Sequence, residues 1–179
     1  MTLELDRDRI SAVVDAVADR LDGDWILIGG GLVALWLEPR RVTEDVDLVG
    51  VTGSGSDRLA LLGLARDLDL PVEALNSAAD YFVYKNADWR EQLEPFRTGA
   101  KGRIFRPTAT LFLLLKVSRL SDEDLTDCLA LLDRARTDGL TIDVARVAAA
   151  LAVVVRHDDE ARQRRDQLQT ALTEFDASK

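Results

Sequence analysis

The sequence predicts an α+β fold, in which a mixed β-sheet flanked by helices is followed by a helical C-terminal half. The chain has 179 residues, of which 47% are hydrophobic, and this is enough to bury a core. Short apolar segments of strand length alternate with helical periodicity over residues 1–106, whereas apolar residues recur only at helical spacing over residues 107–179. We therefore expect an α/β core over the first range, with a helical region packed on it over the second, together forming a single compact unit.

The expected α/β core alternates short strands with amphipathic helices, which are recognised from their apolar spacing. Pro39 limits the second helix to about two turns, because the residue before a proline disfavours the helical conformation. Pro71 is expected to open a strand with the sequence VEAL. The expected elements are a helix over residues 7–21, a strand over 25–28, a helix over 31–37, a strand over 46–51, a helix over 59–68, and strands over 72–75, 81–84 and 101–106.

The second half of the sequence carries signals for the ends of helices. Pro107 is expected in the first turn of a helix that runs to Arg119. Ser121 is expected to cap the next helix, with Asp124 completing a near capping box, and Gly139 is expected to end it. The buried stripe of this helix is predicted to comprise Leu125, Cys128, Leu129 and Leu132. Two further helices are expected over residues 143–156 and 159–175.

The composition disfavours several classes of protein. Cys128 is the single cysteine, so neither a disulfide framework nor a thiolate zinc site can form within one chain, which suits a reducing cytoplasm. The formal net charge of −9 repels nucleic acid and anionic membranes at long range. The charged N-terminal sequence does not resemble a signal peptide, and the longest apolar runs are too short to span a bilayer. We expect a cytoplasmic protein that does not associate with membranes.

One segment is basic, although the chain as a whole carries a net negative charge. Residues 97–120 contain no acid, and their basic residues are Arg97, Lys101, Arg103, Arg106, Lys116 and Arg119. A local basic strip on an acidic protein fits a compact anionic ligand better than a long nucleic-acid track. The alternative is a basic surface hairpin that leads into a helix.

Three consecutive glycines, residues 29–31, follow an apolar strand and open a helix. The sequence over residues 29–34 matches the pattern G-x-G-x-x-A of dinucleotide-binding proteins. However, the helix is too short for a crossover between parallel strands. Asp45 and Asp47 also stand at the start of their strand, whereas a ribose-binding acid lies at the carboxyl end. The dinucleotide interpretation is therefore disfavoured.

A site for a metal ion and a phosphate accounts for the glycines and the aspartates together. Because strand side chains alternate, Asp45 and Asp47 are expected to share one face and to form a hard-oxygen site for Mg²⁺. Glycines at a strand-to-helix turn allow a phosphate to approach the free N–H groups of the helix. If the two strands pair antiparallel, the aspartates lie beside the glycines. The alternative is a tight turn next to two solvated aspartates that bind no ligand.

These residues resemble the DNA polymerase beta-like nucleotidyltransferases, and most closely the small bacterial branch of AbiEii-type and related toxin-like proteins. The family pattern of a strand, Gly-Gly, a short helix and R-x-T-x-D-x-D is matched by Gly29–Gly30 and by residues 41–47. A second block, LFLLLKVSRLSDEDLTD, is similar to a family segment with a lysine in one helix and an arginine and aspartates opening the next. The resemblance covers about residues 25–130.

The resemblance implies roles for individual residues. Asp45 and Asp47 would bind the metal, and Glu73 is the candidate third carboxylate, because a lone acid in an apolar strand needs a partner such as a cation. The residues implied in nucleotide binding are Gly29, Gly30, Gly31, Arg41, Thr43, Lys116, Arg119 and Asp127. Some have simpler explanations. Glu73 could face water from an edge strand, and Lys116 could extend to solvent from an apolar helix. Asp124 could be only a cap, and Asp127 only a surface acid.

The implied reaction is the Mg²⁺-dependent transfer of a nucleotide from an NTP to an acceptor, with two ions at the carboxylates. Related toxin-like proteins modify tRNA or a protein, so the acceptor would belong to one of these classes, and a partner from a toxin–antitoxin pair is implied. Gly31 departs from the family, since many active members have serine after the two glycines. The alternatives are a catalytically degenerate member that acts as a binding or antitoxin-like partner, and a nucleotide sensor.

Overall fold

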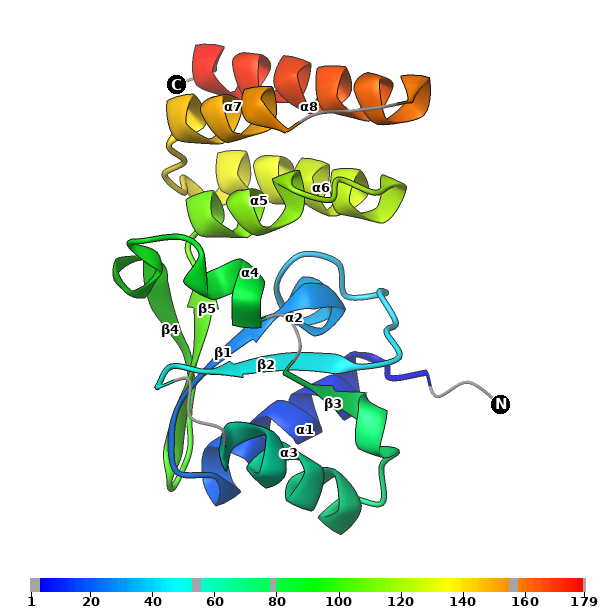
Figure 1. Ribbon diagram of the computed structural model, residues 1–179, viewed down its shortest axis with the longest axis vertical. Helices are drawn as coiled ribbons and strands as arrows, with labels where there is room; N and C mark the ends of the chain where they lie inside the picture. The colour runs from blue at the N-terminus through cyan, green and yellow to red at the C-terminus, as the bar shows by residue number, and fades with distance from the viewer. Residues whose placement is uncertain (1–3, 53–55, 78–79, 155–157, 179) are drawn as a thin grey trace. The chain divides into compact units, whose positions relative to one another are not determined.

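The computed structural model describes residues 4–52, 56–77, 80–154 and 158–178. The chain divides into two compact units, Met1–Pro107 (unit 1) and Thr108–Lys179 (unit 2). Unit 1 contains a mixed five-stranded sheet with helices, and unit 2 is helical (Figure 1). The expected α+β fold with a helical C-terminal half is therefore confirmed.

The sheet of unit 1 is centred on β1 (Gly23–Ile28). This strand pairs antiparallel with β2 (Val46–Gly50) and parallel with β5 (Gly102–Pro107). β2 pairs parallel with β3 (Leu75–Asn76), and β5 pairs antiparallel with β4 (Leu93–Thr98). The resulting order is β3-β2-β1-β5-β4. The last four residues of β1 are buried, as the continuous apolar run WILI requires of a central strand.

Helices cover this sheet and connect its strands. The longest is α1, which Asp6 caps by accepting a hydrogen bond from the Arg9 backbone N–H (2.9 Å), and it packs against α2, β4 and β5. The helical elements of unit 1 are α1 (Arg7–Arg20), α2 (Gly29–Trp36), α3 (Ser56–Asp67), η1 (Val72–Ala74), α4 (Asp80–Tyr84) and η2 (Trp89–Gln92).

Two predicted strands are wrong. The segment after Pro71 forms the 3₁₀ turn η1, and only Leu75 and Asn76 join the sheet. Val72 is 59% exposed, so this segment lacks the buried alternation that holds a strand. Residues 81–84 lie in the helix α4. Aromatic residues favour strands where they pack on a half-buried sheet, but Tyr81 is 69% exposed and has no such surface.

β4 is not among the predicted strands, and it contains Pro95. Proline cannot donate to a sheet ladder and is therefore tolerated mainly on edge strands. β4 is the edge strand next to β5, and its register shifts between Pro95 and Arg97. Pro107 also differs from expectation, since it ends β5 instead of opening a helix.

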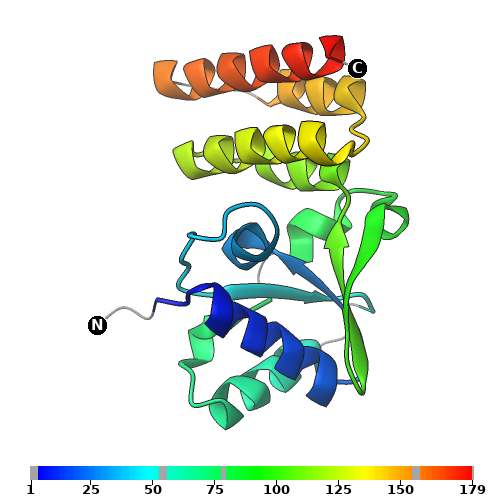
Figure 2. The same cartoon turned by 180° about the vertical axis from the view of Figure 1, so that it is seen from behind.

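In the described part of unit 2 the helices form a bundle, in which α5 and α8 each pack against both α6 and α7 (Figure 2). Thr108 caps α5, and its Oγ1 accepts from the Leu111 N–H (3.3 Å). Leu129 is 37% exposed, so its predicted burial is wrong. The end predicted for the third helix, residues 155–156, lies outside the described residues. The helices are α5 (Ala109–Val117), α6 (Asp122–Asp138), α7 (Val144–Val153) and α8 (Asp159–Ala177).

The ends of α6 follow the sequence signals. The Asp124 N–H donates to Ser121 Oγ (3.2 Å), and the Ser121 N–H donates to Asp124 Oδ2 (3.1 Å), which completes the capping box. Gly139 ends the helix in the left-handed conformation, with φ of 67°. In the part of the chain that the structure describes, every helix is too short or too polar to cross a membrane.

The conformation of Gly139 gives a test of this helix end. A methyl group at position 139 would meet no atom within 4 Å, so the cost of Gly139→Ala is conformational. We expect the free energy of unfolding to fall by about 1 kcal/mol. The control is Gly63→Ala in the middle of α3, where a methyl group is also free of contacts. It should raise stability by up to about 1 kcal/mol. Urea denaturation measures both, and equal effects of the two substitutions would contradict the assignment.

Candidate functional site

The antiparallel pairing of β1 with β2 places Asp47 beside the start of α2. Ile28, the last residue of β1, pairs with Asp47, and α2 begins at the next residue, Gly29. Val46 and Leu48 are fully buried on the opposite face of β2, whereas Asp45 and Asp47 are only half-buried. The alternation of β2 therefore turns its acids toward the strand-to-helix turn and its aliphatic residues into the core.

The first two glycines of α2 make room for the neighbouring side chains. Gly29 has φ of 66°, and a Cβ at this position would collide with Asp47 Oδ2. A Cβ on Gly30 would lie 2.7 Å from Thr43 Oγ1. Gly31 differs, since a Cβ there would meet the core at ordinary distance, 3.4 Å from Val46 Cγ1. The close approach thus requires glycine at positions 29 and 30 but not at position 31.

Asn76 joins the two aspartates. It pairs with Asp47 in the parallel ladder of β2 and β3. Its Nδ2 donates to Asp47 Oδ1 (3.1 Å) and to Asp45 Oδ2 (3.5 Å), while Thr43 Oγ1 donates to Asp45 Oδ1 (3.5 Å). The structure therefore gathers Asp45, Asp47, Asn76 and Thr43 beside Gly29. Asn76 is not among the predicted site residues, although its place directly after the apolar VEAL segment marks it as a polar strand end.

Arg41 and Glu73 were also predicted to belong to this site. Arg41 lies in the turn after α2, where its N–H donates to Glu38 O (2.9 Å). Glu73 is exposed on η1. Across the described ranges, no three His, Cys, Asp or Glu residues are grouped so that they could hold a metal ion, so Glu73 is not gathered with Asp45 and Asp47.

The donor set that remains still fits Mg²⁺. This ion is usually held by one or two carboxylates together with water and substrate phosphates. Asp45 and Asp47 provide the two carboxylates, and the carboxylate of Asp47 lies in the space that a side chain at position 29 would fill. The side chain of Ile28 does not cap α2, and the N-terminus of a helix favours an anion as a partner. The cluster can therefore accept a cation and an anion side by side.

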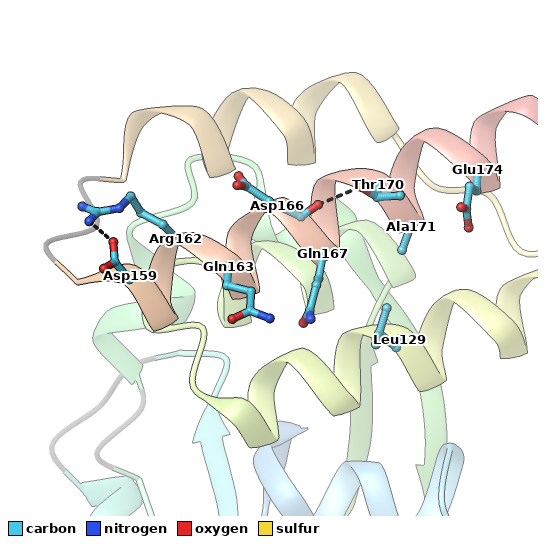
Figure 3. A pocket seen from close by; sticks show the side chains of 9 residues that line it. All are labelled: Leu129, Asp159, Arg162, Gln163, Asp166, Gln167, Thr170, Ala171 and Glu174. Carbon is cyan, nitrogen blue, oxygen red and sulfur yellow. Dashed lines mark hydrogen bonds and ion pairs between the residues drawn. The ribbon is translucent and has the colours of Figure 1, made fainter.

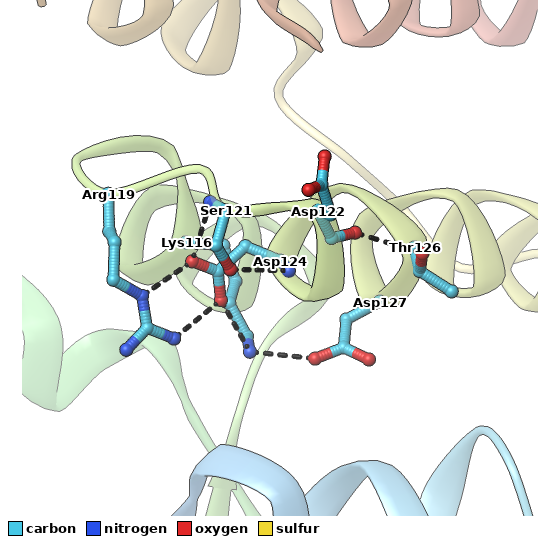
Figure 4. Close-up of polar contacts among 7 residues, drawn as sticks. All are labelled: Lys116, Arg119, Ser121, Asp122, Asp124, Thr126 and Asp127. Atoms are coloured by element: carbon cyan, nitrogen blue, oxygen red, sulfur yellow. Dashed lines mark hydrogen bonds and ion pairs between the residues drawn. The ribbon is translucent and has the colours of Figure 1, made fainter. Parts of the chain in front are cut away.

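The second predicted block forms a network of charges within unit 2 (Figure 4). Lys116 Nζ donates to Asp124 Oδ1 (3.0 Å) and Asp127 Oδ2 (2.8 Å). Arg119 donates to both oxygens of Asp124 through Nε (2.7 Å) and Nη2 (2.8 Å). The side chains of Asp124 and Asp127 are 0% and 4% exposed. Asp127 is therefore not a surface acid, and Asp124 is more than a cap.

The positive and negative charges of this network compensate one another. Burial alone would raise the pKa of Asp124, but the hydrogen bonds from Arg119 and the charge of Lys116 lower it well below its usual range. Burial would lower the pKa of Lys116, but the charges and hydrogen bonds of Asp127 and Asp124 raise it. Both shifts favour the ionised forms, so the network links α5 to α6 as a set of ion pairs. This gives Lys116 a structural role within unit 2.

The arginines of the basic strip in unit 1 also have acidic partners. Arg97 pairs with Asp15 (3.6 Å), Arg103 with Asp24 (2.7 Å) and Arg106 with Glu94 (2.5 Å). These pairs hold the β4–β5 hairpin and its neighbours together and offset the local positive charge. The structure therefore favours a surface hairpin over an anion-binding strip for this segment.

A groove of about 820 Å³ lies elsewhere, between α6 and α8 of unit 2 (Figure 3). Leu129 contributes from α6, and the other lining residues come from α8. Arg162 in its wall forms an ion pair with Asp159. None of the predicted site residues lines this groove.

No protein-family model, curated protein or solved structure matches the chain. The functional argument therefore depends on the local geometry around Asp45 and Asp47.

The contrast between neighbouring glycines provides a test of this geometry. Gly29→Ala should lower the free energy of unfolding by about 2 kcal/mol or more, because it forces a methyl group against Asp47 at a positive φ. Gly31→Ala should change it by less than about 1 kcal/mol, since its methyl group meets the core at ordinary distance. Chemical denaturation measures both variants, and a larger loss for Gly31→Ala would contradict the described packing.

The buried network predicts a pH-dependent loss of stability. The pKa of Asp124 is lower in the folded state than the ordinary value of about 3.9, so its ionised form stabilises the fold above about pH 4. This contribution is lost as the pH falls toward the folded-state pKa. Asp124→Asn should therefore cost about 3 kcal/mol at pH 7 and progressively less below pH 4.

Urea denaturation from pH 7 to pH 2 measures this difference. Asp122→Asn is a matched control, because Asp122 lies in the same helical turn but its side chain is 88% exposed and pairs with Arg164 at the surface. It should cost less than about 1 kcal/mol. A cost of Asp124→Asn that does not depend on pH would contradict the role of the ionised carboxylate.

Proposed function

We propose that unit 1 is the core of a Mg²⁺-dependent nucleotidyltransferase related to the DNA polymerase beta-like superfamily, which transfers a nucleotide from an NTP to an acceptor. One observation carries the proposal: the carboxylates of Asp45 and Asp47 converge on Asn76 Nδ2 next to the glycine turn that opens α2. An acid pair next to the N-terminus of a helix can hold a metal ion and a phosphate together, as nucleotidyl transfer requires.

The residues of this cluster have distinct roles in the proposal. Asp45 and Asp47 hold the divalent ion, and Thr43 orients Asp45 through its hydroxyl group. The N–H groups at the start of α2 bind phosphate oxygens, and Gly29 and Gly30 allow Asp47 and Thr43 to lie directly against this turn. When bound, Mg²⁺ neutralises phosphate charge and activates the attacking oxygen. Two carboxylates are a usual protein contribution to one Mg²⁺, so the proposal requires a single protein-held ion.

The proposed reaction is a substitution at the α-phosphorus of the NTP. An oxygen of the acceptor loses its proton to water and forms a bond to this phosphorus, while the bond from the α-phosphorus to the oxygen that bridges it to the β-phosphorus breaks and pyrophosphate leaves with the electron pair. The protein contributes position and charge neutralisation. The resemblance suggests tRNA or a protein as the acceptor, and the proposal extends to a partner from a toxin–antitoxin pair.

A second candidate function is nucleotide binding without transfer, as in a degenerate, antitoxin-like partner or a sensor. It is favoured by the position of Glu73, which leaves two carboxylates in the cluster where a third was expected. NTPs labelled at the α-phosphate separate the two functions. Label that enters tRNA or protein supports transfer, whereas metal-dependent binding without labelling of any acceptor supports the second candidate.

Isothermal titration with ATP, GTP, CTP and UTP in Mg²⁺ tests the proposed site. We expect at least one NTP to bind with Mg²⁺ and to lose about tenfold or more in affinity in EDTA. Asp45→Asn and Asp47→Asn should weaken Mg²⁺-dependent binding to a similar extent, because each removes a charge from the ion. Asp15→Asn, a surface acid on α1 that pairs with Arg97, is the control and should bind like the wild type. Equal binding with and without Mg²⁺ would rule out the proposed role of the aspartates.

A further inference from the structure

Residues 81–90 of unit 1 combine aromatic side chains with cations. Aromatic residues make up 6% of the chain, yet four of them, including both tyrosines, lie in this segment. They are Tyr81, Phe82, Tyr84 and Trp89. The segment also carries Lys85 and Arg90, while its one acid, Asp88, accepts a hydrogen bond from Gln92 (3.0 Å). Aromatic residues interleaved with cations are typical of surfaces that bind unpaired nucleobases and their phosphates.

The inner side chains of this segment hold it against the end of β2. The Tyr84 hydroxyl donates to the Gly50 carbonyl (2.6 Å), and the Tyr84 ring lies 5.3 Å from the ring of Trp89. Trp89 is 4% exposed, so it belongs to the core. Arg90 Nη2 donates to the Val51 carbonyl (3.4 Å). These contacts fix α4 and η2 on the sheet without using the outer face of α4.

The outer face of α4 carries two exposed aromatic rings. Tyr81 is 69% exposed and Phe82 is 43% exposed, and their rings meet edge to face with centroids 5.7 Å apart. Val83, between the inner and outer side chains, is the fully buried residue of the helix. The two outer rings are therefore not needed to fill the core, and their faces are accessible for stacking.

Two cations lie next to aromatic rings of the same segment. Lys85 Nζ is 5.1 Å from the centre of the Phe82 ring, and Arg90 Cζ is 4.3 Å from that of Trp89. Both cations are exposed. Within the described ranges neither forms an ion pair with an acid, whereas the three arginines of the β4–β5 hairpin each do. Their charge is therefore available to an anionic partner.

The charge of the chain limits which anionic partner fits. A net charge of −9 repels a long nucleic-acid duplex, and the segment offers two cations, enough for a few phosphates. The bases of a duplex are also stacked on each other, so they cannot stack on side chains. A short single strand presents both unpaired bases and phosphates, which complements exposed rings next to unpaired cations.

We propose that this part of the chain is a binding surface for a short single-stranded segment of nucleic acid. Two rings stack on unpaired bases, and two cations bind the phosphates that join them. The surface, called the α4 surface below, consists of Tyr81, Phe82, Lys85 and Arg90.

The α4 surface lies on the same side of the sheet as the candidate metal site. A Cβ on Gly50 would collide with Asp57 of α3, so the residues of β2 that alternate with Gly50 face away from α3. Asp45 and Asp47 belong to that opposite face. Figure 1 shows α2 and α4 on one side of β2, with α1 and α3 on the other. The bound strand is therefore the acceptor of the transfer reaction. This last step rests on the proposed function, whereas binding of the strand does not.

Fluorescence anisotropy with labelled oligonucleotides tests the α4 surface in the full-length protein. The probes are oligoadenylates of about 20 nucleotides, as RNA and as DNA, and the duplex of each with its complement. EDTA is present, so that the candidate metal site takes no part. At low ionic strength, a single strand should bind about tenfold or more tightly than its duplex. The arm that binds more tightly identifies RNA or DNA as the partner. Equal binding of single strand and duplex, or no binding, would overturn the inference.

Substitutions of the two rings locate the binding. Tyr81→Ala and Phe82→Ala should each weaken binding of the single strand about fivefold or more, whereas Tyr81→Phe keeps the ring and should bind like the wild type. Leu59→Ala is the matched control, because it removes an exposed apolar side chain (70% exposed) from α3. Circular dichroism establishes that each variant is folded. If both alanine variants at the rings bind like the wild type, the strand does not stack on α4.

The salt dependence of binding tests the cations. The slope of log affinity against log salt concentration changes by about 0.7 for each phosphate contact with a single strand. Lys85→Gln should therefore make the slope about 0.7 less steep. Lys101→Gln makes the same change of charge in the exposed turn between β4 and β5 and should leave the slope unchanged. Equal slopes for the two variants would show that Lys85 does not contact a phosphate.

NTP titration of the same variants in Mg²⁺ separates this inference from the proposed function. Tyr81→Ala should bind the NTP like the wild type while it loses affinity for the oligonucleotide. If Tyr81→Ala loses only NTP binding, the ring holds the base of the NTP and the inference is wrong. If the oligonucleotide binds but no NTP does, the α4 surface stands and the proposed function fails. If an NTP binds with Mg²⁺ but no oligonucleotide does, the inference fails, and a protein acceptor is then favoured.

Discussion

The candidate site depends on one register, the antiparallel pairing of Ile28 with Asp47. β1 passes directly into α2 at Gly29, so this pairing sets a carboxylate against the first residue of the helix. The same register buries Val46 and Leu48. A slip by one residue would turn the acids into the core and the aliphatic side chains toward the turn, at a large cost. The hydrophobic pattern that holds the sheet together therefore also positions the acids.

Aspartate has two different roles in this chain, which its surroundings decide. In unit 2, Asp124 is fully buried and accepts hydrogen bonds from Lys116 and Arg119. Such a network contributes mainly through the penalty for breaking it, and it joins two helices in one arrangement. In unit 1, Asp45 and Asp47 are half-buried and accept from an amide and a hydroxyl group. Those contacts orient the carboxylates while leaving them partly accessible, as a binding site requires.

Much of this structure was predictable because it is encoded locally. Apolar spacing and caps identify the helices, and the capping box of Ser121 and Asp124 forms as expected. The proximity of Asp47 to Gly29 followed from strand polarity and one assumed antiparallel pair. Asn76 was not predictable in this way, since its contact with Asp45 joins residues 31 positions apart and depends on which strand lies next to β2. Glu73 was chosen because its segment was expected to be a full strand.

Residues 72–75 do not form the predicted strand, and this has a structural consequence for the candidate site. A full-length strand beside β2 would have covered the edge of the sheet next to Asp47. β3 instead consists of two residues, which both pair with β2, and it is the edge strand of the sheet. It is long enough to bring Asn76 to the carboxylates, yet it ends there, so the acids remain half-buried and not enclosed. The exposed Val72 and Glu73 therefore interrupt the expected alternation before the chain reaches Asn76, and they limit β3 to two residues.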